Sequence, residues 1–174
     1  LIAKGAAIDA KEIEGYTPLI LASHKGHLGL VELLVSNKAD INATTNSRCT
    51  ALMWASKRGH LDICSYLISK GCDIKAMDDR KFTPLHYASY YGHLDVAELL
   101  ISKGAEIDAK DIDGQTPLIL AVKDHGHLKL FELLVSKQAD INATTNDERT
   151  ALHETSIKGY FEIAEYLIAK GATI

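Results

Sequence analysis

Cysteine is scarce in this sequence. The three cysteines, Cys49, Cys64 and Cys72, are odd in number and form no C-x-x-C pair. Small secreted domains that depend on disulfides usually have an even number of closely spaced cysteines. We therefore expect no disulfide framework and an intracellular, cytoplasmic location.

Long apolar runs and a basic excess are also missing. No stretch approaches the roughly 20 apolar residues that a membrane-spanning helix needs, so we expect no membrane partner. The 19 Lys and Arg are outnumbered by 23 Asp and Glu, which gives a net charge of −4. Proteins that bind nucleic acid usually show a strong basic excess, so we expect no nucleic-acid partner.

The N-terminus lacks an initiator Met and the features of a signal peptide. Residues 1–5 have neither a charged start nor a small-residue cleavage site. We expect the chain to be a fragment or a processed product. Leu1 and Ile2 should lie inside the last helix of a unit whose beginning is missing.

A strong internal repeat is what the sequence does contain. A short motif that begins with Thr, often followed by Pro and Leu, and ends near Gly-His-Leu occurs five times. Its Thr residues are Thr17, Thr50, Thr83, Thr116 and Thr150, at intervals of 33, 33, 33 and 34 residues. Such a period indicates a stacked repeat architecture, in which one unit cannot bury its own apolar face. We expect one array over residues 1–174, made of the end of a unit at 1–11, full units at 12–44, 45–77, 78–110 and 111–144, and a last unit at 145–174.

Each unit has the signals of two short helices. Thr is a preferred helix N-cap, and Pro18, Pro84 and Pro117 follow it at the first helical position, where the missing N–H costs nothing. A Gly such as Gly26 ends the first helix, because it accepts the left-handed conformation. A second apolar helix follows, and polar turn residues lead to the next Thr. The fold class is therefore all-α.

These motifs resemble the ankyrin repeat. The third unit is the nearest to the pattern, with Thr83-Pro84-Leu85-His86, Gly92-His93-Leu94 and Gly104-Ala105. The resemblance implies antiparallel helix pairs with β-hairpin-like loops on one side. It also implies binding of other proteins through the loop tips and the short inner helices. We expect a monomer without cofactor or metal.

Several positions depart from the family pattern. Arg48, Lys81 and Glu148 stand where the hairpin Gly is expected, and Lys38 and Gln138 replace the Gly that ends the second helix. A non-Gly residue with positive φ costs about 1 kcal/mol, so each departure should carry a penalty of this size. One residue is inserted near Lys123-Asp124-His125, which should lengthen the turn or bulge the first helix of unit four.

No catalytic motif is present, and we expect the protein not to be an enzyme. Six of the eight His recur at fixed repeat positions, and none belongs to a four-ligand set with zinc-like spacing. Cys64 and Cys72 fall at apolar or small-residue positions and should be buried and inert. Cys49 falls in a hairpin, where we expect exposure, and a reactive thiol there is the alternative.

The resemblance predicts the residues that face a partner. All but Trp54 precede a Thr or lie just before a Gly-His pair, and Trp54 is one of the aromatic residues in the middle of the array. The predicted partner-binding residues are Tyr16, Lys25, Trp54, Lys57, Arg58, Phe82, Tyr90, Tyr91, Gln115 and Lys123.

The inner-helix positions are mostly basic, and the middle of the array is rich in aromatic residues, which are common interface anchors. We therefore expect a partner with an acidic or mixed segment, centred on units two to four. Trp54 and Tyr87 could equally pack between units.

Two alternatives remain open. Residues 107–121 resemble 8–22, and residues 132–146 resemble 32–46, which indicates duplication of a three-unit block. A structural spacer or scaffold segment of a longer array would also show this pattern. Separately, Asn42 and Asn142 lie in contexts similar to the asparagine-hydroxylation sites of ankyrin repeats. They are modification candidates, and the alternative is that both only hydrogen-bond the loop.

Overall fold

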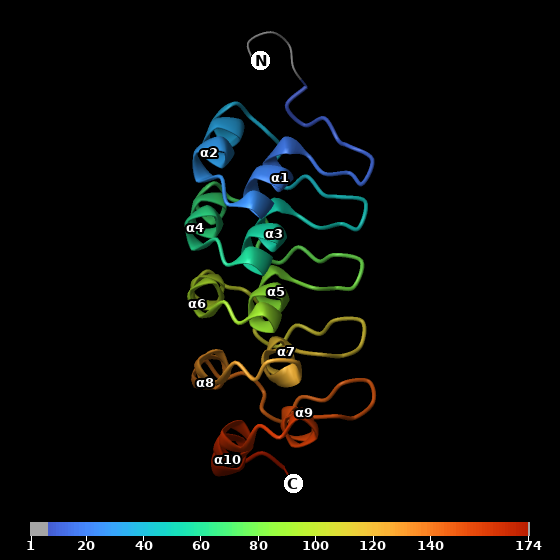
Figure 1. The fold of residues 1–174 in the computed structure, drawn as a ribbon, viewed down its shortest axis with the longest axis vertical. Coiled ribbons are helices and arrows are strands. Elements are labelled where there is room, and N and C mark those ends of the chain that lie inside the picture. The colour runs from blue at the N-terminus through green and yellow to red at the C-terminus, as the bar shows by residue number, and fades with distance from the viewer. Residues whose placement is uncertain (1–6, 174) are drawn as a thin grey trace.

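The computed structural model describes residues 7–173 as a single row of stacked helix pairs (Figure 1). Each unit contributes one inner helix and one outer helix. The inner helices are α1 (Pro18–Lys25), α3 (Ala51–Arg58), α5 (Pro84–Tyr91), α7 (Pro117–Lys123) and α9 (Ala151–Lys158). The outer helices are α2 (Leu28–Ser36), α4 (Leu61–Ser69), α6 (Leu94–Ser102), α8 (Leu128–Ser136) and α10 (Phe161–Ala169). The helix end expected at Leu1 and Ile2 lies outside the described residues.

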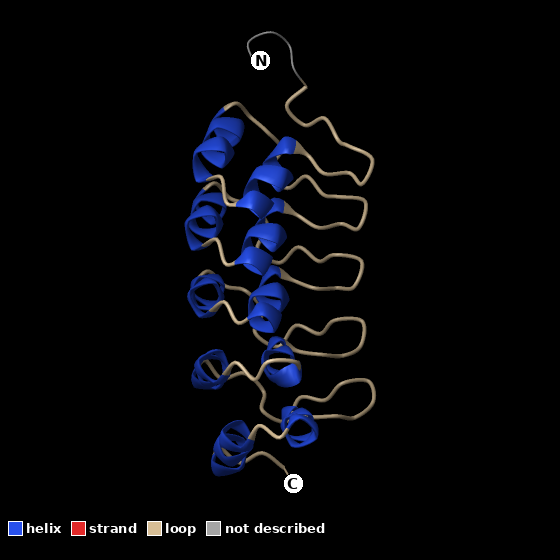
Figure 2. Ribbon diagram, in the orientation of Figure 1, coloured by secondary structure: helices blue, strands red, loops and turns tan. Residues whose placement is uncertain are grey.

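Loops project from the inner helices to one side of the row, and no strand is drawn among the described residues (Figure 2). Each loop closes like a hairpin: in the third unit the Asp78 N–H donates to the Phe82 carbonyl at 3.1 Å. Neighbouring loops are also joined, since the Ile112 N–H donates to the Arg80 carbonyl at 3.0 Å. The all-α fold with hairpin-like loops is confirmed.

The local signals act as the sequence predicts. The Thr83 hydroxyl accepts a hydrogen bond from the His86 N–H, and Gly92 ends α5 with φ +75°. The five non-Gly residues expected in the left-handed region are all found there, with φ between 58° and 70°. The insertion in unit four shortens α7 to seven residues and lengthens the turn that follows, so Asp124 rather than a left-handed Gly caps this helix.

One continuous apolar core runs along the row between the inner and outer helices. Leu19, Leu52, Leu85 and Leu118 are fully buried at the same position of successive inner helices. Because every unit buries apolar side chains against the next unit, stability depends on the interfaces between units. No helix among the described residues is both long and apolar enough to cross a membrane.

Polar contacts repeat from unit to unit beside this core. The imidazole Nε2 of His93 lies 3.1 Å from the carbonyl oxygen of Lys57, and that of His127 lies 3.3 Å from the carbonyl oxygen of Tyr90. In unit five Tyr160 replaces His, and its hydroxyl donates to the carbonyl of Asp124 at 2.7 Å. These bonds hold the ends of the inner helices, and with them the surface that those ends present.

Candidate interaction surface

Inner helices and hairpin loops meet in a hollow at the middle of the array. A pocket of about 240 Å³ opens there between units two and four. We call it the basic pocket; it is lined by Lys57, Arg80, Phe82, Tyr87, Tyr90, Tyr91, Gln115, Leu120 and Lys123. Six of the ten predicted partner-binding residues therefore surround one cavity, although they come from three successive units.

Lys57 is held among aromatic rings. Its Nζ lies 4.8 Å from the ring centroid of Trp54, 5.8 Å from that of Tyr87 and 5.4 Å from that of Tyr91. A cation over the face of a ring is attracted by the negative side of the ring quadrupole. The ammonium group of this half-buried residue is thus positioned without neutralisation of its charge.

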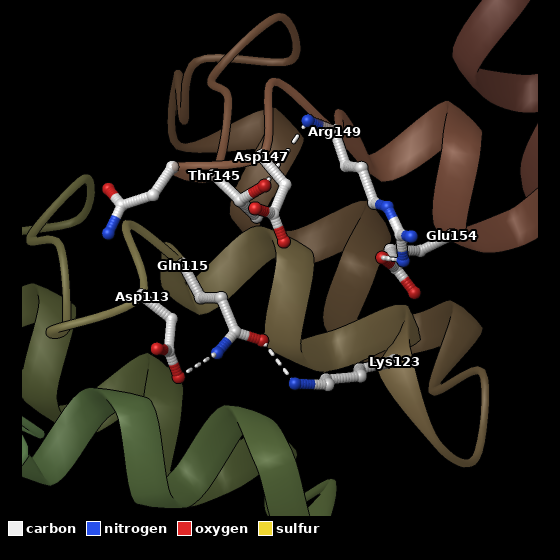
Figure 3. A pocket seen from close by; sticks show the side chains of 8 residues that line it. Asp113, Gln115, Lys123, Thr145, Asp147, Arg149 and Glu154 are labelled. Atoms are coloured by element: carbon white, nitrogen blue, oxygen red, sulfur yellow. Dashed lines mark hydrogen bonds and ion pairs between the residues drawn. The ribbon is translucent and has the colours of Figure 1, made fainter.

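Two other cations are positioned in a similar way. The Arg80 guanidinium lies 4.8 Å from the ring centroid of Phe82. The Lys123 ammonium donates to Oε1 of Gln115 at 2.6 Å, and the Gln115 amide nitrogen donates to Oδ2 of Asp113 at 3.3 Å (Figure 3). The same amide nitrogen lies 3.1 Å from Oδ2 of Asp111. A ring and a neutral amide, rather than a carboxylate, hold these two groups.

Two tyrosine hydroxyls of this region donate hydrogen bonds to carboxylates. Tyr87 donates to Oδ2 of Asp78 at 2.6 Å. The pKa of Tyr87 is raised, mainly by burial and secondly by this hydrogen bond. Tyr90 donates to Oδ2 of Asp124, and this bond is the main reason that the pKa of Asp124 is lowered. The Tyr91 side chain is 41% exposed and faces solvent at the pocket.

The remaining predicted residues lie toward the first unit. The ring centroid of Trp54 lies 5.5 Å from that of Tyr16 and 4.5 Å from that of His24. Arg58 donates to Nε2 of His24 at 2.8 Å, and burial together with this cation lowers the pKa of His24. Lys25 and Arg58 are exposed, whereas Trp54 and Tyr16 are half-buried between units.

Three exposure expectations are wrong. Phe82 and Gln115 are only 6% and 4% exposed, because the Phe82 ring packs against His86 and Tyr87 and the Gln115 amide donates to the buried Asp111. Cys49 is 7% exposed, with its Sγ 3.7 Å from the Tyr87 hydroxyl and 3.9 Å from Asp78. These residues can shape the pocket, but their side chains offer little area to a partner.

The sequence alone did not single out Arg80, which lines the pocket, or Asp78, which lies behind the lining. Asp78 is buried and accepts from the Arg80 and Phe82 N–H groups, each at 2.8 Å, so it sets the hairpin conformation that carries Arg80. The available signal was an Asp two residues before Arg80, the spacing at which an Asp side chain accepts a backbone N–H in an Asx-turn.

A second pocket adjoins the first. It has a volume of about 420 Å³ and shares Gln115 and Lys123 with the basic pocket. Its other charged lining residues are Asp113, Asp147, Arg149 and Glu154, and Arg149 and Glu154 lie 3.8 Å apart (Figure 3). The hollow thus continues toward unit five with a mixed charge.

Nucleophilic and metal-binding groups do not gather in either pocket. Burial raises the pKa of the Cys64 and Cys72 thiols to about 12, which keeps them protonated. No cluster of three or more His, Cys, Asp or Glu side chains suited to a metal ion occurs within residues 7–173.

The fold and this surface define a helical repeat array with a hollow between its inner helices and its loops. A family profile described as ankyrin repeats in three copies matches residues 1–78, 43–111 and 108–174. The chain therefore belongs to the ankyrin repeat family, whose members are generally protein-interaction modules. A search of curated proteins found no match to the chain.

Proposed function

We propose that this chain is a non-enzymatic protein-interaction module. It binds an acidic or mixed-charge segment of another protein through its concave face and hairpin tips, centred on units two to four. The basic pocket is the observation that supports this proposal, because its lining combines three cations with aromatic rings. Aromatic residues and Arg supply much of the binding energy at protein interfaces.

Charge also favours an acidic segment at this location. The whole chain carries a net charge of −4, yet the lining of the basic pocket includes Lys57, Arg80 and Lys123 and no acidic residue. A local basic surface on an acidic protein orients an approaching partner, because complementary potentials favour one face over the others. The neighbouring mixed-charge pocket suits a partner segment that also carries a basic residue.

Combined replacement of Tyr90, Tyr91 and Lys57 by Ala tests the location. The variant should lose partner capture from a cell lysate, because it removes two aromatic contacts and one cation from the pocket. Its melting temperature should change little, since all three side chains are exposed or only half-buried.

A control of matched composition replaces Tyr66, Tyr166 and Lys129 by Ala. These residues belong to outer helices α4, α10 and α8, away from the pocket. The control should capture the partner normally, and its melting temperature reports the cost of removing two half-buried tyrosines. Undiminished capture by the variant with three replacements in the pocket would reject the location.

A structural spacer or scaffold segment is the second candidate. The near-identity of residues 8–22 and 107–121 supports it, because duplication of blocks extends an array without any need for a unique binding site. A bait screen separates the two functions: a scaffold would return no partner that depends on the basic pocket.

Asn42 and Asn142 remain modification candidates. Both are exposed, and their Oδ1 atoms accept hydrogen bonds from Asp73 N–H and Thr173 N–H, each at 2.9 Å. We propose hydroxylation of these residues as a secondary property, and the loop bond as its alternative. Mass spectrometry of native protein that finds both residues unmodified ends the hydroxylation proposal.

The division into units at 12–44, 45–77, 78–110, 111–144 and 145–174 is likewise our proposal, as are a monomeric state and a cytoplasmic location. The monomer can be checked by sedimentation, which should give the 19.0 kDa of one chain.

A further inference from the structure

The three cations of the basic pocket share an unusual arrangement. Each is held in place by a neutral group: Lys57 by three aromatic rings, Arg80 by the Phe82 ring and Lys123 by the Gln115 amide. Among residues 7–173, the ion pairs join Arg149 to Glu154 and Lys158 to Asp124, so none of the three cations has an acidic partner within 4 Å.

Two nearby acids are bonded to other groups, and a third, Asp113, accepts from the Gln115 amide rather than from Lys123. Both oxygens of Asp78 accept hydrogen bonds, from two backbone N–H groups and from the Tyr87 hydroxyl. Asp124 accepts from Tyr90 and lies 3.6 Å from Lys158. The pocket therefore presents fixed positive charge that the protein itself leaves unneutralised, and fixed donors lose less conformational entropy when they bind.

We propose that the basic pocket receives a phosphorylated side chain of the partner segment, an inference that rests on the proposed function. A phosphate monoester carries a charge of about −1.5 to −2 and three acceptor oxygens. Three separate cations match this group better than they match a carboxylate, which has one charge and two oxygens. The exposed Tyr91 side chain supplies a further hydroxyl at the pocket.

A nucleotide fits the pocket less well. A base needs a free aromatic face for stacking. The rings of Trp54, Tyr87 and Tyr91 are within 6 Å of the Lys57 ammonium, and the Phe82 ring is covered by Arg80. The Tyr90 and Tyr91 rings pack edge to face on each other. The phosphoryl group, rather than a base, is the part that the pocket can take.

NMR titration of the full ¹⁵N-labelled chain tests the proposal with three probes: N-acetyl-O-phosphoserine amide, N-acetylglutamate amide and AMP. The phosphoserine probe should cause saturable shifts at Lys57, Arg80 and Tyr91 and bind about tenfold more tightly than the glutamate probe, as expected from its extra charge. Equal binding of the glutamate probe, tighter binding of AMP, or no saturable shift in the pocket would each overturn the proposal.

Arg80→Gln gives the sharpest variant, because Arg80 is exposed on a hairpin and its loss should not unfold the protein. This variant and Lys57→Gln should each weaken binding of the phosphoserine probe by about tenfold or more, the effect of one charge-assisted contact. Lys25→Gln removes an exposed cation from α1, outside the pocket, and should leave binding unchanged. Full binding by Arg80→Gln, or equal loss in Lys25→Gln, would contradict the assignment.

Phosphatase treatment of the lysate separates this inference from the proposed function. Loss of capture after treatment supports both. Capture that survives treatment but still requires Tyr90, Tyr91 and Lys57 overturns the phosphoryl inference and keeps the interaction module. Capture that does not require these residues, together with saturable probe shifts in the pocket, keeps the anion site and rejects the proposed partner surface.

Discussion

Nε2 of His86 lies 3.2 Å from the carbonyl oxygen of Gln115, so the imidazole of unit three bonds to the hairpin of unit four. Nδ1 of the same ring accepts the Thr83 N–H at 3.1 Å. The pair of contacts requires a neutral ring that is protonated on Nε2. Burial lowers the pKa of His86, while the Gln115 carbonyl and the nearby Asp111 and Asp78 partly oppose this effect.

The pH dependence of stability follows from this contact. The pKa of His86 is below its ordinary 6.5 in the folded chain, so the unfolded chain binds more protons between the two values. The free energy of unfolding should therefore fall as the pH drops below about 6.5. Urea denaturation between pH 7.5 and 5.5 measures this decrease.

His86→Ile should reduce the slope, because Ile119 already occupies the equivalent position of unit four. His127, whose pKa burial also lowers, accounts for part of the slope that remains. His153→Ile is the control, since His153 holds the same position but is exposed. A slope in the His86 variant equal to that of the parent chain would contradict the assignment.

Gly59→Ala should be strongly destabilising. Gly59 has φ +74°, and an added Cβ would lie 2.5 Å from Nδ1 of His93 in the next unit. The left-handed conformation alone costs a non-Gly residue about 1–2 kcal/mol, and the clash adds to this. Urea denaturation measures the loss in the free energy of unfolding, which should equal the conformational cost plus the cost of the clash.

Gly104→Ala separates the two contributions. Gly104 also has positive φ, at +89°, but an added Cβ there meets nothing within 4 Å. The free energy of unfolding of this variant should fall only by the cost of positive φ for a non-Gly residue. Equal losses in the two variants would show that the His93 ring moves aside freely.

Gln138→Gly should stabilise the protein. Gln138 has φ +70°, a conformation that Gly adopts without strain. The gain should be about 0.5–1 kcal/mol, because the added flexibility of Gly in the unfolded chain offsets part of the relief. The adjacent Lys137→Gly is the control. Because φ is −90° at Lys137, Gly relieves no strain there and only adds flexibility to the unfolded chain, so this variant should be less stable. Destabilisation of both variants to the same extent would argue against strain at Gln138.

The thiols should be unreactive in the folded protein. All three cysteines are buried, and burial raises the pKa of Cys64 and Cys72 to about 12. With a thiol-specific disulfide reagent at pH 8, the native chain should react slowly and the urea-denatured chain should react at three groups. Fast reaction of one thiol in the native chain would show that the hairpin around Cys49 opens.

Prediction from the sequence succeeded where one residue determines its own backbone. Thr at a helix start, Gly at a helix end and the five strained non-Gly positions all depend on local conformation, and the fixed period extends each assignment to every unit. It was wrong about the exposure of Phe82, Gln115 and Cys49, because exposure depends on how the next unit covers each loop.

The sequence by itself determined the helix pairs, their order and the row that they form, since a 33-residue period of capped, half-apolar helices has no other way to bury its apolar faces. Only the tertiary structure decided which charged side chains line the same pocket. Lys57, Arg80 and Lys123 belong to three different units, and the rings and the amide that hold them were not apparent from spacing. Such contacts depend on the stacking distance between units and on side-chain rotamers, neither of which the period encodes.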